Sequence, residues 1–209
     1  MVKPSPQKQR GKTTRLTKRV MLIGTEGKNK TETRYFNHFN QIQKEFRVQF
    51  SFGNSTDAVG IVEDIKNSQS ALNFRSGDLA FAVFDADLWR TQGNRIQEAI
   101  DYAKEQKIKV VLSNPCFEVW FVLHFEDSKA PYDSSAGVIK KLKRYISGYE
   151  KKMDVFEVLW GKERTAIKHA EGLRTYHEDN RTKPSERNPM TDVDQVVKKL
   201  CGSDETVQG

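Results

Sequence analysis

Four acidic residues closely follow apolar segments of the sequence. They are Glu26, Asp85, Asp87 and Glu118. Carboxylate oxygens are ligands that magnesium and manganese favour, and a bound divalent ion can activate water and neutralise charge on a phosphate. In Asp85-Ala86-Asp87 the alternation of an extended chain turns both carboxylates to one side, where they can hold one ion or bridge two. Either aspartate alone could simply end a strand in solvent, so the hypothesis of a metal site depends on all four residues.

The elements that would position these carboxylates alternate between strands and helices. Short apolar segments predict strands over residues 20–24, 48–52, 79–84 and 109–112. Helical spacing of apolar residues predicts helices over 31–46, 58–72 and 93–106. This order predicts an α/β fold with a mostly parallel sheet and helices on both faces. Ligands of such sheets bind outside the carboxyl ends of the strands, so we expect the carboxylates at one rim.

The segment after residue 112 is predicted to open another helix. Asn114 is expected as its N-cap, with Pro115 at the first helical position. The helix would carry an apolar face of Phe117, Trp120, Phe121 and His124. Glu118 in its first turn either favours the positive end of the helix dipole or acts as a metal ligand or active-site acid. Further on, we expect a looser basic region over 130–149, helices over 162–179 and 193–200, and a polar loop over 181–189.

The sequence resembles the RloB family of Toprim-like proteins over roughly residues 20–200. The matching stretches are Glu26-Gly27, Thr31-Glu32, Tyr35-Phe36, 83–87, 113–120, His124-Phe125, Asn188-Pro189 and 191–193. The segment 113–120, Ser-Asn-Pro-Cys-Phe-Glu-Val-Trp, is the most specific of them. The chain departs from the family at Ala86, where a basic residue is common, and at Thr33, where proline is common.

The resemblance implies a Toprim-like mostly parallel central sheet flanked by helices, with a helical C-terminal extension. The Toprim-like domain would span 19–160, and 161–209 would complete it, with disordered last residues. It also implies a divalent-metal-dependent endonuclease that uses Mg²⁺, with Mn²⁺ able to substitute. Glu26 would be the metal-linked acid–base residue, and Asp85 and Asp87 would be metal ligands.

The resemblance further implies a part in antiphage defence, including abortive infection, because RloB-like genes accompany restriction loci. RNA, transfer RNA included, is favoured over DNA by analogy. A toxic effector needs restraint, so we expect a partner ATPase or sensor protein that restrains or triggers it. The alternative is a nucleic-acid or partner-binding module with a regulatory metal site and no turnover.

Several basic and aromatic residues could contact nucleic acid. Lys28, Lys30 and Arg34 flank the predicted site and could hold phosphates, or they could belong to a solvated loop. Trp89 is a candidate for base stacking. A basic stretch interrupted by Tyr145 and Tyr149 is typical of a phosphate-tracking surface, but also of an ordinary helix with a solvated face. Its cations are Lys140, Lys141, Lys143, Arg144, Lys151 and Lys152.

The charge and cysteine content narrow the function classes. Seven of the 35 Lys and Arg residues lie in 1–19, which hold no acid, so 28 remain against 28 acidic residues. Residues 1–18 are therefore predicted to be a flexible basic arm that could steer the protein to phosphate. Cys116 and Cys201 lack metal-ligand spacing, so neither a zinc site nor a disulfide framework is expected. Because no apolar run approaches a membrane span or a signal sequence, we expect a cytoplasmic protein without membrane contact.

Overall fold

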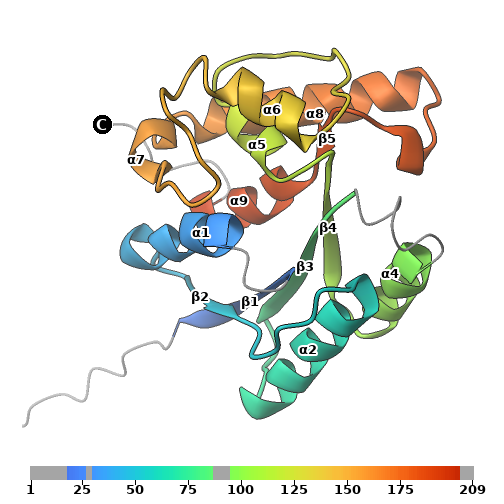
Figure 1. The fold of residues 1–209 in the computed structure, drawn as a ribbon. Coiled ribbons are helices and arrows are strands. Elements are labelled where there is room, and N and C mark those ends of the chain that lie inside the picture. The colour runs from blue at the N-terminus through green and yellow to red at the C-terminus, as the bar shows by residue number, and fades with distance from the viewer. Residues whose placement is uncertain (1–17, 27–29, 87–94, 203–209) are drawn as a thin grey trace, which may run out of the picture.

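A five-stranded sheet forms the centre of the protein, in a computed structural model that describes residues 18–26, 30–86 and 95–202. Its strand order is β2-β1-β3-β4-β5 (Figure 1). The bounds are β1 Arg19–Thr25, β2 Phe46–Phe50, β3 Leu79–Asp85, β4 Lys109–Asn114 and β5 Met190–Thr191. The first four strands are parallel, and β5 pairs with β4 in the antiparallel direction. The predicted mixed α/β fold with a mostly parallel sheet is confirmed, and β5 is an addition that the sequence did not indicate.

Helices cover both faces of this sheet (Figure 1). One face carries α2 (Ala58–Ala71) and α4 (Arg95–Glu105). The other face carries α1 (Lys30–Ile42), α5 (Glu118–Val122), α6 (Ser135–Leu142), α7 (Phe156–Leu159), α8 (Glu163–Asp179) and α9 (Val193–Cys201). A short 3₁₀ turn, Pro184–Glu186, lies between α8 and β5. The C-terminal helices thus build the same layer as α1 and α5.

The alternation of strand β1 explains its continuous apolar sequence. Met21 and Ile23 are fully buried in the core on the α1 side, whereas Leu22 is fully buried in the core under α2 and α4. A strand covered on both faces needs apolar residues at every position. Gly24 allows α2 to approach closely, because a Cβ atom there would lie 2.5 Å from Ile65 Cγ1.

The first helix ends earlier than the spacing of apolar residues predicted. Helix α1 stops at Ile42, and Phe46 begins β2 instead of ending the helix. The side chain of Gln43 accepts a hydrogen bond from the Glu45 backbone N–H (2.6 Å) and donates one to the Leu200 carbonyl (2.8 Å). These bonds turn the chain after Ile42 and fix it to α9, so a contact distant in sequence ends the helix.

The predicted N-cap at Asn114 is wrong. Asn114 is the last residue of β4, where it pairs with Met190 of β5, and its side-chain amide donates to the Arg187 carbonyl (2.6 Å). The Asn114–Pro115 peptide bond is cis, and α5 begins only at Glu118. Pairing with β5 extends the strand through the position where the helix was expected to start. The region 130–149, expected to be loose, contains α6.

The last two helices lie close to their predicted positions and are tied together by charge. The Asp194 carboxylate of α9 is fully buried and accepts from Arg174 of α8 (2.7 Å) and from Lys198 (2.8 Å). A buried carboxylate paired in this way holds two helices in a fixed arrangement. Within the described part of the chain, no helix has the length and apolar character needed to cross a membrane.

Candidate active site

Glu26 and Asp85 lie at the carboxyl ends of two neighbouring strands. The parallel register of β1 and β3 pairs Thr25 with Val83, so Glu26 and Asp85 lie just beyond the last pair. Neighbouring strands are about 4.8 Å apart, which brings the two residues to adjacent positions on the rim. Asp85 shares its side of β3 with Phe81 and Val83, which pack in the core on the α1 side. Both carboxylate residues are partly exposed at this rim.

Two buried glutamates lie behind this pair. Glu32 is in the first turn of α1 and Glu118 begins α5, and each is less than 5% exposed. Burial raises the pKa of Glu32 to about 7, and the negative charges of Glu118 and Glu26 add to this effect. The charges of Glu118 and Glu26 thus act on buried Glu32, so residues that follow β1, begin α1 and begin α5 influence one another at this end of the sheet.

Lys151 supplies a positive charge to the same cluster. Burial lowers its pKa, but the attraction of Glu118, and of Asp85 and Glu32 with it, outweighs that effect and raises the pKa. The Thr31 hydroxyl donates a hydrogen bond to the Lys151 carbonyl, which holds the segment before α7 against the first turn of α1. Lys151 therefore stays protonated beside the carboxylates.

Two further ionisable side chains in the cluster stay neutral. The hydroxyl of Tyr149, which is fully buried, donates to Glu118 Oε1 at 3.2 Å. Burial, with the charge of Glu118 added, raises the pKa of Tyr149 well above its usual range. Burial raises the pKa of the Cys116 thiol in the same way, assisted by Glu118 and Asp85. Cys116 is thus a buried thiol and not a nucleophile.

The donor set suits a hard divalent cation. Glu26 and Asp85 offer oxygen ligands at an accessible rim, as Mg²⁺ and Mn²⁺ prefer. In residues 18–26, 30–86 and 95–202, no three His, Cys, Asp or Glu side chains are grouped closely enough to hold one ion. Asp87, the predicted third ligand, lies outside these residues. The described part of the chain therefore provides two of the three predicted ligands.

The family follows from a match over most of the chain. The family profile described as RloB-like protein matches residues 21–200. The chain belongs to the RloB-like family. Comparison with curated proteins and with solved structures gave no match. The RloB-like region includes Glu26, Glu32, Asp85, Glu118 and Lys151, and nearly all of both helix layers.

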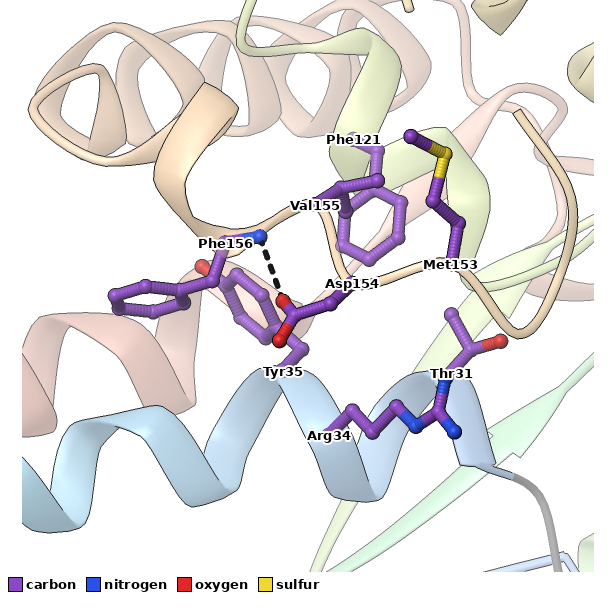
Figure 2. Close-up of a pocket in the computed structure, with 8 residues that line it drawn as sticks. All are labelled: Thr31, Arg34, Tyr35, Phe121, Met153, Asp154, Val155 and Phe156. Carbon is purple, nitrogen blue, oxygen red and sulfur yellow. Dashed lines mark hydrogen bonds between the residues drawn. The ribbon is translucent and has the colours of Figure 1, made fainter. Parts of the chain in front are cut away.

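Among the cations predicted to contact phosphate near the rim, Arg34 has a side chain that the structure describes. This residue is exposed on α1 of the RloB-like region, and its side chain extends toward the Thr31 end of the helix (Figure 2). It lines a small pocket with Asp154, which accepts from the Phe156 backbone N–H (3.1 Å). Lys28 and Trp89 lie outside the described residues, as does the side chain of Lys30.

The basic stretch of the RloB-like region divides into exposed and bound residues. Lys140, Lys143 and Arg144 are exposed at α6 and just after it, whereas Lys141 forms an ion pair with Glu126 (2.8 Å). Tyr149 is buried and therefore not available for base stacking, while Tyr145 is exposed. The sequence placed Lys151 in this stretch but gave no sign that it lies at the carboxylates, because only the fold brings it there.

The aromatic face after Asn114 belongs to the core of the RloB-like region, as its spacing indicated. Phe117, Trp120 and Phe121 are each at most 1% exposed. His124 is also buried, its Nδ1 lies 2.9 Å from the Trp120 carbonyl, and burial lowers its pKa to about 4. A neutral histidine enclosed in this way is a packing residue and not a general base.

Proposed function

We propose that this chain is a divalent-metal-dependent nuclease of the Toprim type that hydrolyses phosphodiester bonds. The observation that supports the proposal is that Glu26 and Asp85 lie at the carboxyl ends of two neighbouring parallel strands. Such rims are where open α/β sheets bind ligands. The charges of Glu118 and Asp85 also act on Lys151 and raise its pKa. Carboxylates for a cation and an ammonium group for a phosphate are the two charges that phosphoryl chemistry requires.

The roles of the residues follow from their positions. Asp85 and Glu26 would hold Mg²⁺ or Mn²⁺ together with Asp87, and Glu26 would also accept or return a proton. Such an ion lowers the pKa of bound water and offsets charge on the reacting phosphate. Lys151 would contact a phosphate oxygen through its ammonium group, which is a compact and mobile point charge.

Glu118 acts on Lys151 and not on the substrate. It is buried, and its Oε1 accepts the Tyr149 hydroxyl, so its charge is fixed in place. Its attraction helps to hold the ammonium group of Lys151 at the rim while leaving part of it exposed. Glu118 is therefore a positioning residue in this proposal.

The biological role is proposed by analogy with the family. RNA, transfer RNA included, is the favoured substrate, and antiphage defence is the favoured setting. A partner ATPase or sensor would control the activity. These parts of the proposal depend on the RloB-like match, whereas the chemistry depends on the rim.

The test is a cleavage assay with purified full-length protein. Total RNA, plasmid and single-stranded DNA are incubated with Mg²⁺, with Mn²⁺ or with EDTA. Asp85→Asn is the test variant, and Asp101→Asn makes the same atomic change on the exposed surface of α4. We expect metal-dependent products with wild type and Asp101→Asn and none with Asp85→Asn.

The alternative class gives a different outcome. A binding module with a regulatory metal site would retain its affinity for nucleic acid in every variant and form no products under any condition. Products that persist in EDTA or in Asp85→Asn would show that the rim is not the reactive centre.

A further inference from the structure

An exposed aromatic stack lies next to the C-terminal end of α5. The Tyr145 and Phe125 rings are parallel, with an interplanar angle of 2° and centroids 4.8 Å apart. Tyr145 is 38% exposed even though Phe125 covers one face of its ring. The Tyr145 hydroxyl donates to Glu126, so the ring is held at both its face and its tip. The outer face of a fixed tyrosine ring is thus presented to solvent.

Positive charge surrounds this stack. The Lys162 ammonium lies 4.5 Å from the centroid of the Phe125 ring, and Lys141 forms an ion pair with Glu126. Arg144 also acts on Glu126, since its charge helps to lower the Glu126 pKa against the effect of burial. The single carboxylate that holds the tyrosine is therefore outnumbered by three cations. The outward-facing Lys140 and Lys143 add to the positive field.

The stack and the carboxylate rim are connected through one short segment. Glu118 at the rim begins α5, and Phe125 follows seven residues later through continued helical turns. A rise of 1.5 Å per residue separates them by about 10 Å. That distance corresponds to about three stacked nucleotides at 3.4 Å each. A strand whose base rests on Tyr145 would therefore have neighbouring nucleotides within reach of the rim.

We infer that Tyr145 stacks an unpaired base, and that the proposed nuclease takes a substrate that is single-stranded at this position. The inference rests on the proposed function for its connection to the rim. A flat exposed ring among cations fits a nucleic acid with free base faces and phosphates. Paired bases in a duplex do not offer their faces to a side chain, so the stack selects against duplexes.

The test measures binding in EDTA, where no metal-dependent cleavage competes. The probes are a labelled RNA oligonucleotide of about 16 nucleotides, the DNA oligonucleotide of the same sequence and the duplex of each with its complement. The test variants are Tyr145→Ala and Tyr145→Leu, of which the second keeps an apolar contact with Phe125. The control is Tyr176→Ala, because Tyr176 is 39% exposed on α8 with the Lys129 ammonium 5.8 Å from its ring centroid. Tyr145→Phe keeps the ring and loses only the hydroxyl.

We expect both test variants to bind single strands about 5- to 150-fold more weakly than wild type, as the loss of one stacked base predicts. Tyr145→Phe, Tyr176→Ala and duplex binding should be close to wild type. Thermal unfolding confirms that each variant is folded. Unchanged single-strand binding in Tyr145→Leu, an equal loss for duplexes, or no single-strand binding by wild type would each overturn the inference.

Failure of the nuclease proposal has a separate signature. If wild type binds single strands through Tyr145 but never cleaves them in Mg²⁺ or Mn²⁺, the stacking site stands and nuclease activity of the chain alone is refuted. If cleavage occurs and Tyr145→Leu binds as wild type does, the nuclease stands and the stacking site is refuted.

Discussion

The two faces of the sheet differ sharply in what they bury. Under α2 and α4 the core is aliphatic with Phe84, and Ser68 is the one buried polar side chain among the residues that the structure describes there. The opposite layer buries many polar and charged side chains: Thr31, Glu32, Gln43, Ser113, Glu118, His124, Glu163, His177, Thr191 and Asp194. Burial of a polar group costs free energy unless a partner compensates it.

For several of these polar groups, a hydrogen bond or an ion pair compensates the cost of burial. Asp194 pairs with Arg174 and Lys198, and Ser113 bonds to Thr191 across β4 and β5 (2.8 Å). Glu32 and Glu118 are different, because burial raises the pKa of Glu32 to about 7 and the negative charge of Glu118 adds to this effect. A local arrangement that the fold does not need is typical of a functional site. The contrast fits the proposal that the α2–α4 face supports the sheet while the opposite face carries the proposed chemistry.

The largest effect is expected at the rim itself. Asp85→Asn should lower the rate of metal-dependent cleavage by about 10³-fold or more, as removal of a single essential group does in other enzymes. Asp101→Asn on α4 should leave the rate unchanged. The measurement is single-turnover cleavage of the substrate identified in the assay above. Equal cleavage rates of Asp85→Asn and Asp101→Asn would contradict a functional difference between the two faces of the sheet.

The next effect concerns stability and its dependence on pH. Folded Glu32 keeps its proton up to about pH 7, whereas an unfolded glutamate loses it near pH 4.5. Protonated Glu32 therefore adds its full contribution to the free energy of unfolding below about pH 4.5. This contribution is lost as the pH rises through 7.

Glu32→Gln removes this ionisation. The variant should match wild type near pH 4.5 and exceed its free energy of unfolding by about 3 kcal/mol above pH 7. Denaturant titration in EDTA at several pH values measures the difference. Glu63→Gln, on the exposed side of α2, should show no such trend. If Glu32→Gln differs from wild type by the same free energy of unfolding at every pH, the pKa of Glu32 is not raised in the folded protein.

A smaller effect on the cleavage rate is expected to distinguish Lys151 from its neighbour Lys152. Lys151→Ala should slow cleavage by about 10- to 100-fold, because a phosphate contact is lost, and Lys152→Ala should have little effect. Both residues are exposed in the same segment, so they form a matched pair. Saturating single-turnover rates distinguish them. Equal losses in both variants would indicate general electrostatic attraction and not a specific contact.

The smallest effect is expected on the supporting face. The Ser68 hydroxyl donates to the Asp64 carbonyl (2.7 Å) and accepts from the Phe52 N–H (2.9 Å). Ser68→Ala should lower the free energy of unfolding by about 1 kcal/mol, by the same amount at pH 5 and pH 8. Cleavage should be unaffected. A change in activity would show that the α2 face also takes part in the chemistry.

The central sheet and the rim could be predicted because their signals are local. Apolar runs such as Leu79–Phe84 identify buried strands without any knowledge of their partners. Parallel order then places Glu26 and Asp85 at one edge, and the register of β1 and β3 agrees with this. Glu118 could be placed near the rim, but its burial and its bond to Tyr149 could not.

The features that could not be predicted depend on contacts between distant parts of the sequence. Two residues, Met190 and Thr191, carry no recognisable strand pattern, yet their pairing with β4 decides that Asn114 ends a strand. The end of α1 depends on the bond from Gln43 to Leu200. The segment of Lys151 lies against α1 because the Thr31 hydroxyl donates to the Lys151 carbonyl across 120 positions of the chain. None of these partners can be read from a window of neighbouring residues.

The dependence of the α1-side core on α9 bears on how the protein is made. Val193, Val196, Val197 and Leu200 are fully or almost fully buried in the same core as Met21 and Ile23. A ribosome releases the chain from its N-terminus, so β1 emerges long before the residues that close its core. The layer that holds Glu32 and Glu118 is therefore completed only after Leu200 has left the exit tunnel. Until α9 emerges, a nascent chain therefore leaves the α1-side core around Met21 and Ile23 open.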